Sequence, residues 1–280
     1  MKFIKFYALS AIILLLMSAC EKFSSEIGKT SEKAEDNNVA LNLSKGNLVK
    51  TVCHKVTFGV FKVDEKIGTI SQSSDDEGFG TVHLSLSPGL YRIVAIGHNG
   101  TGSCTISSPE KITFTSNKVT DTFYYYGTLE AKEDEKTSES ITLKRAVAMF
   151  RLCIKDSIPQ DAKRIQFYYT GGSSTFNAVT GFGCVNSKQT ETLDMNPSQK
   201  VYEVYTFPHE DKDKLKLTIS ILNESGFVMA SNTFEDVEVT KNYITKYSGK
   251  LFGNLSGGMS DISIDFEFDP EWAGENEYEF

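Results

Sequence analysis

The stretch KLKLTISIL, residues 214–222, decides the fold, because its polar and apolar side chains alternate. A period of two is typical of a β-strand that lies with one face on a core. Eight other short segments share this period and are separated by Gly, Ser, Asn, Asp or Pro: VTFGVFKV (56–63), TVHLSL (81–86), LYRIVAIG (90–97), KITFT (111–115), FYYYGTL (123–129), RIQFYY (164–169), VYEVYTF (201–207) and ISIDFEF (262–268). Stretches with helical spacing are scarce, so the sequence predicts an all-β protein built as sandwiches.

The length of the chain predicts two domains. Without residues 1–19, which have the features of a cleaved leader, 280 − 19 = 261 residues remain, and these suit two domains better than one. The charged stretch EAKEDEKTSES (130–140) lacks large apolar residues and is the expected joint. We therefore expect an N-terminal sandwich over 39–140, a C-terminal sandwich over 141–253, and a last strand with an acidic tail over 254–280.

The N-terminal residues predict export. Lys2 and Lys5 precede an apolar run, 6–17, and the small residues Ser18 and Ala19, as in a secretory signal. The run is too short to span a bilayer as a helix, which needs roughly 20 residues. The sequence therefore indicates an export signal and no membrane span in this segment.

Met17-Ser18-Ala19-Cys20 resembles a bacterial lipobox. That resemblance implies cleavage before Cys20, acylation of its thiol and new amino group, and durable attachment to the outer membrane through several acyl chains. The polar segment 20–38 would then tether the lipid to the first domain. The competing interpretation is an ordinary secreted protein whose Cys20 merely lies near the cleavage site.

The formal charge of −8 becomes −8 − 2 = −10 when Lys2 and Lys5 leave with the leader. This balance argues against nucleic acid or an anionic membrane surface as a partner.

Of the five cysteines, Cys20 is the expected lipid site and four remain: Cys53, Cys104, Cys153 and Cys184. An even number in an oxidising compartment allows three disulfide connectivities. We favour Cys53 with Cys104 and Cys153 with Cys184, because each pair stays inside one half of the chain. A zinc site is disfavoured, since no two cysteines form a CxxC pair and no histidine has ligand spacing.

No motif for catalysis, a metal or a cofactor stands out. The four histidines are scattered, and no HExxH, GxSxG, Walker loop or GxGxxG occurs. The acidic run 75–78 lacks the alternating ligand positions of a calcium loop. The sequence therefore predicts a protein that is not an enzyme and holds neither cofactor nor metal.

The aromatic runs 123–126 and 167–169 have two interpretations. Exposed tyrosines could stack on sugars, which would make this a surface glycan-binding lipoprotein. The favoured interpretation is that alternate members face the core.

Residues 141–169 resemble the start of the second domain in the fimbrillin-associated anchor (FimB-type) lipoproteins of Gram-negative anaerobes. In those proteins a Leu-x-Arg-x-Val-Ala strand leads through Ile-Pro to another strand. The matching residues here are Leu143, Arg145, Val147 and Ala148, then Ile158 and Pro159. The lipobox, the Cys53 and Cys104 bracket, the Pro88-Gly89-x-Tyr91 strand entry, the segment 244–253 and Trp272 follow in the expected order.

The resemblance implies two transthyretin-like β-sandwich domains in tandem and a role in anchoring or assembling a fimbrium, with shaft or accessory subunits as partners. Such subunits join by β-strand addition, in which a neighbour's strand satisfies unpaired backbone groups. In relatives that form the shaft, an arginine-specific protease removes the first strand. No arginine lies between Cys20 and Tyr91 here, so arginine cleavage could not release a first strand. The sequence thus predicts a subunit that stays on its lipid.

The C-terminal segment DISIDFEF, residues 261–268, is the candidate for strand addition. Its apolar residues are Ile262, Ile264, Phe266 and Phe268, and they alternate with polar ones. The favoured interpretation is the protein's own last strand. The other is a strand that pairs, part of the time, with another subunit.

Overall fold

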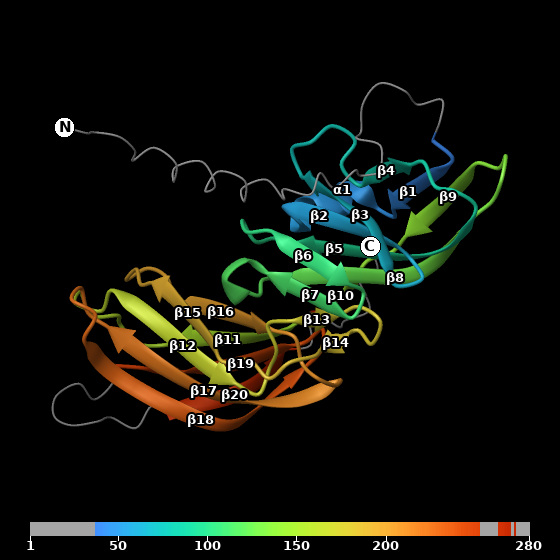
Figure 1. Ribbon diagram of the computed structural model, residues 1–280. Helices are drawn as coiled ribbons and strands as arrows, with labels where there is room; N and C mark the ends of the chain where they lie inside the picture. The colour runs from blue at the N-terminus through green and yellow to red at the C-terminus, as the bar shows by residue number, and fades with distance from the viewer. Residues whose placement is uncertain (1–36, 253–262, 270–271, 273–280) are drawn as a thin grey trace, which may run out of the picture.

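The computed structural model describes residues 37–252, 263–269 and 272, and for 263–269 it describes the backbone. The leader, Cys20, nearly all of the tether, Ile262 and most of the acidic tail lie outside the described residues. Within them the chain forms two β-sandwiches in tandem, so the all-β fold class is confirmed (Figure 1).

The first sandwich packs a three-stranded sheet on a five-stranded sheet. The smaller sheet has the order β4-β1-β9, and the larger one has the order β10-β8-β5-β2-β3. The strands are β1 (Val39–Leu43), β2 (Lys55–Lys62), β3 (Glu65–Ser73), β4 (Thr81–Leu84), β5 (Gly89–His98), β8 (Thr122–Ala131), β9 (Thr137–Ile141) and β10 (Lys144–Arg145). A short helix, α1 (Gly46–Val52), connects β1 to β2. No helix in the described part of the chain is long and apolar enough to cross a membrane.

The alternation in the sequence positions the first core. In β1, Val39, Leu41 and Leu43 are buried, and they pack with Phe58 and Ile93 of the larger sheet. The residues between these positions on β1 are half-buried. One face of this short strand therefore fixes it on the core.

A third sheet joins the two halves of the chain. Its order is β14-β13-β7-β6, from β6 (Cys104–Ser108), β7 (Lys111–Phe114), β13 (Phe176–Asn177) and β14 (Phe182–Gly183). Phe176 of the second half pairs with Ile112 of the first. A 3-10 helix (Thr115–Asn117) follows β7. Residues of both halves, Val94 and Phe207 among them, are buried in a shared core beside this sheet.

The second sandwich packs two four-stranded sheets, β16-β11-β19-β20 and β15-β12-β17-β18. The strands are β11 (Ala148–Ile154), β12 (Arg164–Thr170), β15 (Gln189–Asp194), β16 (Val201–Thr206), β17 (Lys212–Leu222), β18 (Val228–Thr240), β19 (Ile244–Lys250) and β20 (Ser263–Asp269). KLKLTISIL lies in β17, where Leu215, Leu217, Ile219 and Ile221 are buried in the core. Its alternation predicted this strand and its inward face correctly.

The charged stretch 130–140 is not a free joint. Residues 130 and 131 end β8, and Thr137–Ile141 form β9, which pairs in parallel with β1. The side chain of Ser138 bonds the Asn42 amide at 3.1 Å, and Ile141 is fully buried. Parallel pairing with a strand almost 100 residues away gives no local sequence signal. We propose that the chain passes between the halves at 146–147, after β10.

The two predicted disulfides are absent, because all four described cysteines are free thiols. Cys53 is buried in the first core, whereas Cys104 is buried in the shared core on the other face of the five-stranded sheet. Cys153 lies on β11, and Cys184 lies near the carbonyl of Glu110 beside the third sheet. The sheet therefore separates Cys53 from Cys104, and Cys153 and Cys184 belong to different sheets or their borders, which loop spacing in the sequence does not reveal.

Candidate strand-addition interface

Among the described strands, the C-terminal strand β20 lies at the edge of its sheet and pairs with β19 alone. The pairing is antiparallel over seven residues, from Ile244 opposite Asp269 to Lys250 opposite Ser263. Ile264, Phe266 and Phe268 lie opposite Gly249, Tyr247 and Thr245. In this structure the segment is thus the protein's own last strand, as the favoured interpretation predicted.

The strand next to β20 is firmly held by the rest of the sandwich. β19 pairs in parallel with β11 over six residues, from Met149 opposite Ile244 to Ile154 opposite Gly249. Ile244 and Thr245 are buried, and the Thr245 hydroxyl donates to the Glu238 carbonyl at 2.7 Å. Removing β20 would therefore expose a backbone edge on a strand that stays in place.

Beyond β20, Trp272 packs where the two halves meet. Its ring stacks on Tyr205 of β16, with ring centres 6.0 Å apart, and the guanidinium carbon of Arg145 lies 4.0 Å from its centre. The guanidinium carbon of Arg145 also lies 4.7 Å from the centre of the Phe123 ring. We call Arg145, Trp272, Tyr205, Asp121 and Phe123 the clasp.

The charges and hydrogen bonds within the clasp suit an arginine at position 145. Arg145 donates from Nε to Asp121 Oδ1 at 2.8 Å and from a terminal nitrogen to Oδ2 at 3.1 Å, a two-pronged pair. Burial raises the pKa of Asp121, and the guanidinium opposes that rise. Burial, with Glu203 and Asp121 nearby, also raises the pKa of Tyr205, which stays neutral. Two aromatic faces and a buried carboxylate thus hold one cation.

The first strand, β1, is central in its sheet. It pairs antiparallel with β4 and in parallel with β9, and its three inward residues are buried. Asn38 secures its start: the amide donates to the Leu86 carbonyl at 2.7 Å and accepts from the Leu86 N–H at 2.8 Å. Withdrawing β1 would therefore break two ladders and open the first core.

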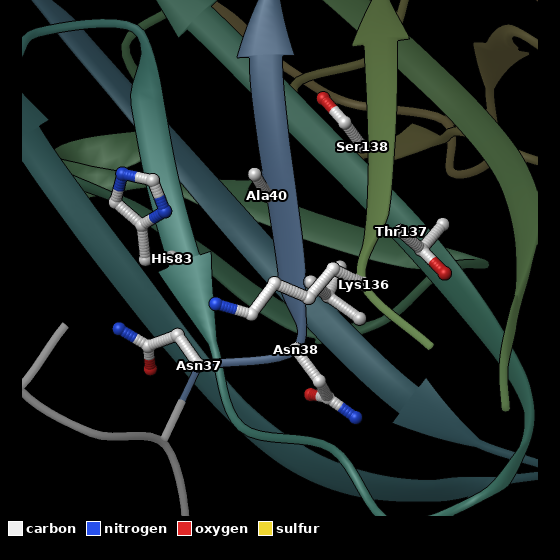
Figure 2. A pocket seen from close by; sticks show the side chains of 8 residues that line it. Asn37, Asn38, Ala40, His83, Lys136, Thr137 and Ser138 are labelled. Carbon is white, nitrogen blue, oxygen red and sulfur yellow. The ribbon is translucent and has the colours of Figure 1, made fainter. Parts of the chain in front are cut away.

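A pocket of about 280 Å³ lies at the start of β1, on the outer face of its sheet (Figure 2). Ala40 forms its floor and lies opposite His83 on one side and Ser138 on the other. In Figure 2 the Lys136 amine extends toward Asn37 and His83, while Asn38 points away. The pocket is open, and it lies at the start of the first described strand.

The tyrosine runs do not form an exposed platform. Phe123, Phe167 and Tyr169 are buried, and Tyr168 is 39% exposed. Tyr125 packs on the first core, whereas Tyr124 and Tyr126 pack on the shared core, because both faces of the five-stranded sheet are covered. Burial of alternate members holds for 167–169, whereas in 123–126 the members on both faces of the sheet pack on a core.

The described residues contain no group of three or more metal-ligating side chains. His209 bonds Asp213 at 2.9 Å. His83 lies on β4, His98 ends β5, and His54 lies between α1 and β2, where its backbone N–H donates to the His98 carbonyl at 2.9 Å. Sequence reasoning had noted Arg145 and Trp272 separately and missed Asp121 and Tyr205. Their meeting depends on the packing of two domains, for which the sequence holds no local pattern.

Three solved structures show what the chain resembles. A candidate adhesin from Bacteroides ovatus ATCC 8483 is 13% identical, with a TM-score of 0.50 over 74% of this chain and 87% of that one. Another candidate adhesin from Bacteroides ovatus is 9% identical, with a TM-score of 0.50 over 82% and 94%. The fimbrial anchor protein Mfa2 from Porphyromonas gingivalis is 9% identical, with a TM-score of 0.43 over 86% and 99%. The first two support the same fold.

Two further comparisons concern the sequence. A family model described as a family of unknown function (DUF6562) matches residues 103–280. No curated protein matches the chain.

Proposed function

Because the chain belongs to the family of unknown function (DUF6562), whose description assigns no activity, we propose its function from the placement of its terminal strands. The protein is a non-enzymatic lipoprotein of the outer membrane that serves as a fimbrial anchor or accessory subunit. Cys20 carries the lipid, and a fimbrial shaft or accessory subunit is the partner, joined by β-strand addition.

The observation that carries this proposal is the position of β20. It is an edge strand held by one ladder, and residues 253–262 connect it to β19. Its withdrawal leaves the order of the other strands intact and frees a seven-residue backbone edge. A strand of the partner then takes the place of β20, or β20 itself pairs with the partner.

The N-terminal strand β1 differs from β20 in its pairing, and this difference suits it to carry the attachment to the lipid. β1 is paired on both sides, and no arginine precedes Tyr91, so arginine cleavage leaves it in place. The tether enters at a strand that stays in the fold, while the exchangeable strand lies at the other end of the chain. This polarity fits a subunit that is fixed at one end and joined at the other. The fold shared with two candidate adhesins agrees with a surface role.

The proposed function can be tested by purifying the lipid-anchored protein from outer membranes together with the proteins that are bound to it. We expect fimbrial subunits to co-purify with the wild type and to be lost when residues 261–280 are deleted. Deletion of 273–280 is the matched control, because it keeps both β20 and Trp272. Recovery of the same partners by both deletions would refute strand addition at this edge.

Lipidation has its own test. Labelled fatty acid should enter the wild type and not Cys20→Ser. Equal labelling of both would contradict the proposed anchor.

A further inference from the structure

The clasp lies near the end of β20, so a strand in the place of β20 delivers a side chain to it. The last residue of β20, Asp269, pairs with Ile244, the first residue of β19. Two residues before Ile244, the side chain of Asn242 accepts a hydrogen bond from Arg145 at 3.3 Å. Trp272, which fills the clasp, comes three residues after Asp269. A partner's strand in this register would therefore bring the residue at the same spacing to the clasp.

Arg145 is held in position by residues other than Trp272. It lies opposite Phe123 in the ladder between β8 and β10, with its guanidinium over the Phe123 ring. Asp121 accepts hydrogen bonds from two of its nitrogens, at 2.8 and 3.1 Å, and Asn242 accepts from the third. The guanidinium is therefore preorganised by contacts that do not involve the C-terminal segment, which lowers the cost of binding a ring on it.

The face of the guanidinium that Trp272 covers suits a flat aromatic ring. Each of the three nitrogens already donates within the plane to Asp121 or Asn242, so an incoming side chain meets mainly the flat face. A guanidinium is attracted to the negative face of an aromatic ring, and tryptophan gives the strongest contact of this kind. A cationic side chain would be repelled by Arg145, and an aliphatic one lacks the attraction.

Tyr205 supplies the second wall of the clasp. Its ring stacks on Trp272 with 21° between the two planes. Its backbone is fixed, because its carbonyl accepts from the Tyr169 hydroxyl at 2.9 Å and the residue pairs with Met149 in the ladder between β11 and β16. Tyr205 and Trp272 pack against the shared core and are only partly buried. A side chain that replaces Trp272 can therefore reach the clasp from solvent.

We propose that the clasp is a second recognition site for the partner: when the partner's strand replaces β20, an aromatic side chain of the partner takes the place of Trp272 between Arg145 and Tyr205. This inference rests on the proposed strand addition at β20. It gives the partner a chemical signature, which is a strand of alternating polarity followed, three residues after its last paired position, by an aromatic residue. Tryptophan is the preferred residue. While β20 is in place, Trp272 occupies the clasp and excludes the partner's ring.

The clasp can be tested without strand exchange in the full chain carrying Trp272→Ala, labelled with ¹⁵N-arginine and purified in detergent. The probes are N-acetyl-tryptophanamide and N-acetyl-leucinamide, and NMR follows the Nε–H signals of the four arginines. We expect a saturable shift of the Arg145 signal with the tryptophan amide at millimolar concentration, and roughly tenfold weaker binding of the leucine amide. The wild-type chain, whose clasp holds Trp272, should respond much more weakly. No shift, equal binding of the two amides, or an equal response of the wild type would overturn the proposal.

A further variant assigns the binding to the clasp. Tyr205→Leu, added to Trp272→Ala, removes the stacking ring and should weaken binding of the tryptophan amide by about three- to tenfold. Tyr168→Leu is the matched control and should leave binding unchanged, because Tyr168 is a 39% exposed tyrosine on β12, in the other sheet of the second sandwich. Thermal unfolding shows whether each variant is folded. Unaltered binding in the folded Tyr205→Leu variant would refute the site.

Peptides distinguish this inference from strand addition itself, and they need no variant of the chain. Immobilised wild-type protein, held just below its unfolding temperature so that β20 can exchange, is titrated with the peptide of residues 261–272 and with the same peptide carrying Trp272→Leu. We expect the tryptophan peptide to bind roughly tenfold more tightly. Equal binding of both peptides would overturn the role of the clasp and leave strand addition standing. Binding of neither peptide would overturn strand addition at β20 and, with it, this role of the clasp.

Discussion

The guanidinium of Arg145 lies between two aromatic rings, 4.7 Å from the centre of Phe123 and 4.0 Å from the centre of Trp272. Phe123 belongs to the first sandwich, and Trp272 follows the last strand of the second. The C-terminal segment is therefore held both by the β19 ladder and by a contact with the other half of the chain.

Trp272→Ala should weaken this second attachment. We expect a loss of about 1–3 kcal/mol in the free energy of unfolding, because a cation–π contact and a stacked ring both disappear. Urea unfolding measures it. Trp272→Phe keeps a ring over Arg145 and should lose less; equal losses would mean that the ring does not contact the guanidinium in solution.

Arg145→Met should be more damaging. It leaves the carboxylate of Asp121 without the cation that opposes its burial, at a cost of about 3–5 kcal/mol. Denaturant unfolding provides the measurement. The double variant Arg145→Met with Asp121→Asn removes the unpaired charge and should recover part of the loss. No recovery would show that the charge is not what destabilises the single variant.

Deletion of residues 261–280 tests whether β20, the protein's own last strand in this structure, can also leave the sheet. We expect the truncated chain to remain folded but to unfold at a lower temperature, because one seven-residue ladder and the Trp272 contact are lost. A synthetic peptide of residues 261–272 should then bind and restore the unfolding temperature. A peptide of the same composition without the alternation is the control, and equal rescue by both would argue against a specific edge.

The thiols should differ in reactivity. Burial raises the pKa of Cys53 to about 12 and also raises that of Cys104, so both should resist alkylation in the folded protein. Cys184 is exposed and should react. Mass spectrometry after native labelling, and again after unfolding without reductant, follows each site. Failure of these cysteines to label in the unfolded chain would indicate disulfides and contradict the structure.

His98 should make stability depend on pH. Its folded pKa is about 4 against an ordinary value of 6.5, so the unfolded chain binds more protons between these values. Stability should therefore be fully present above pH 6.5 and fall as the pH drops toward 4, by at most about 3 kcal/mol. His98→Asn keeps an acceptor for Gly100 and should flatten this slope. An unchanged slope would mean that other groups titrate.

Sequence reasoning succeeded where the signal is local. The alternation in 214–222 places Leu217 and Ile219 in the core, and the predicted strands at 56–63 and 90–97 correspond to β2 and β5 of the five-stranded sheet. One buried face fixes both the strand and its orientation, so no knowledge of partners is needed.

It failed where partners are distant in sequence. The polar segment Thr137–Ile141 forms a strand because β1 accepts it in parallel, and the cysteines stay apart because a sheet separates Cys53 from Cys104. The clasp likewise depends on how Tyr205 and Asp121 meet across two domains. Strand register and domain packing depend on residues that are far apart in the sequence. The charge and spacing of neighbouring residues therefore do not predict them.

The position of β1 between two partners has a mechanical consequence. A pull on the tether along the strand axis loads the hydrogen bonds to β4 and β9 together, in shear, so that they resist as a group. A strand peeled sideways from an edge would instead lose its bonds one after another. With the proposed attachment through Cys20, force from the membrane would enter the molecule at its more resistant strand, and the single ladder of β20 would yield first.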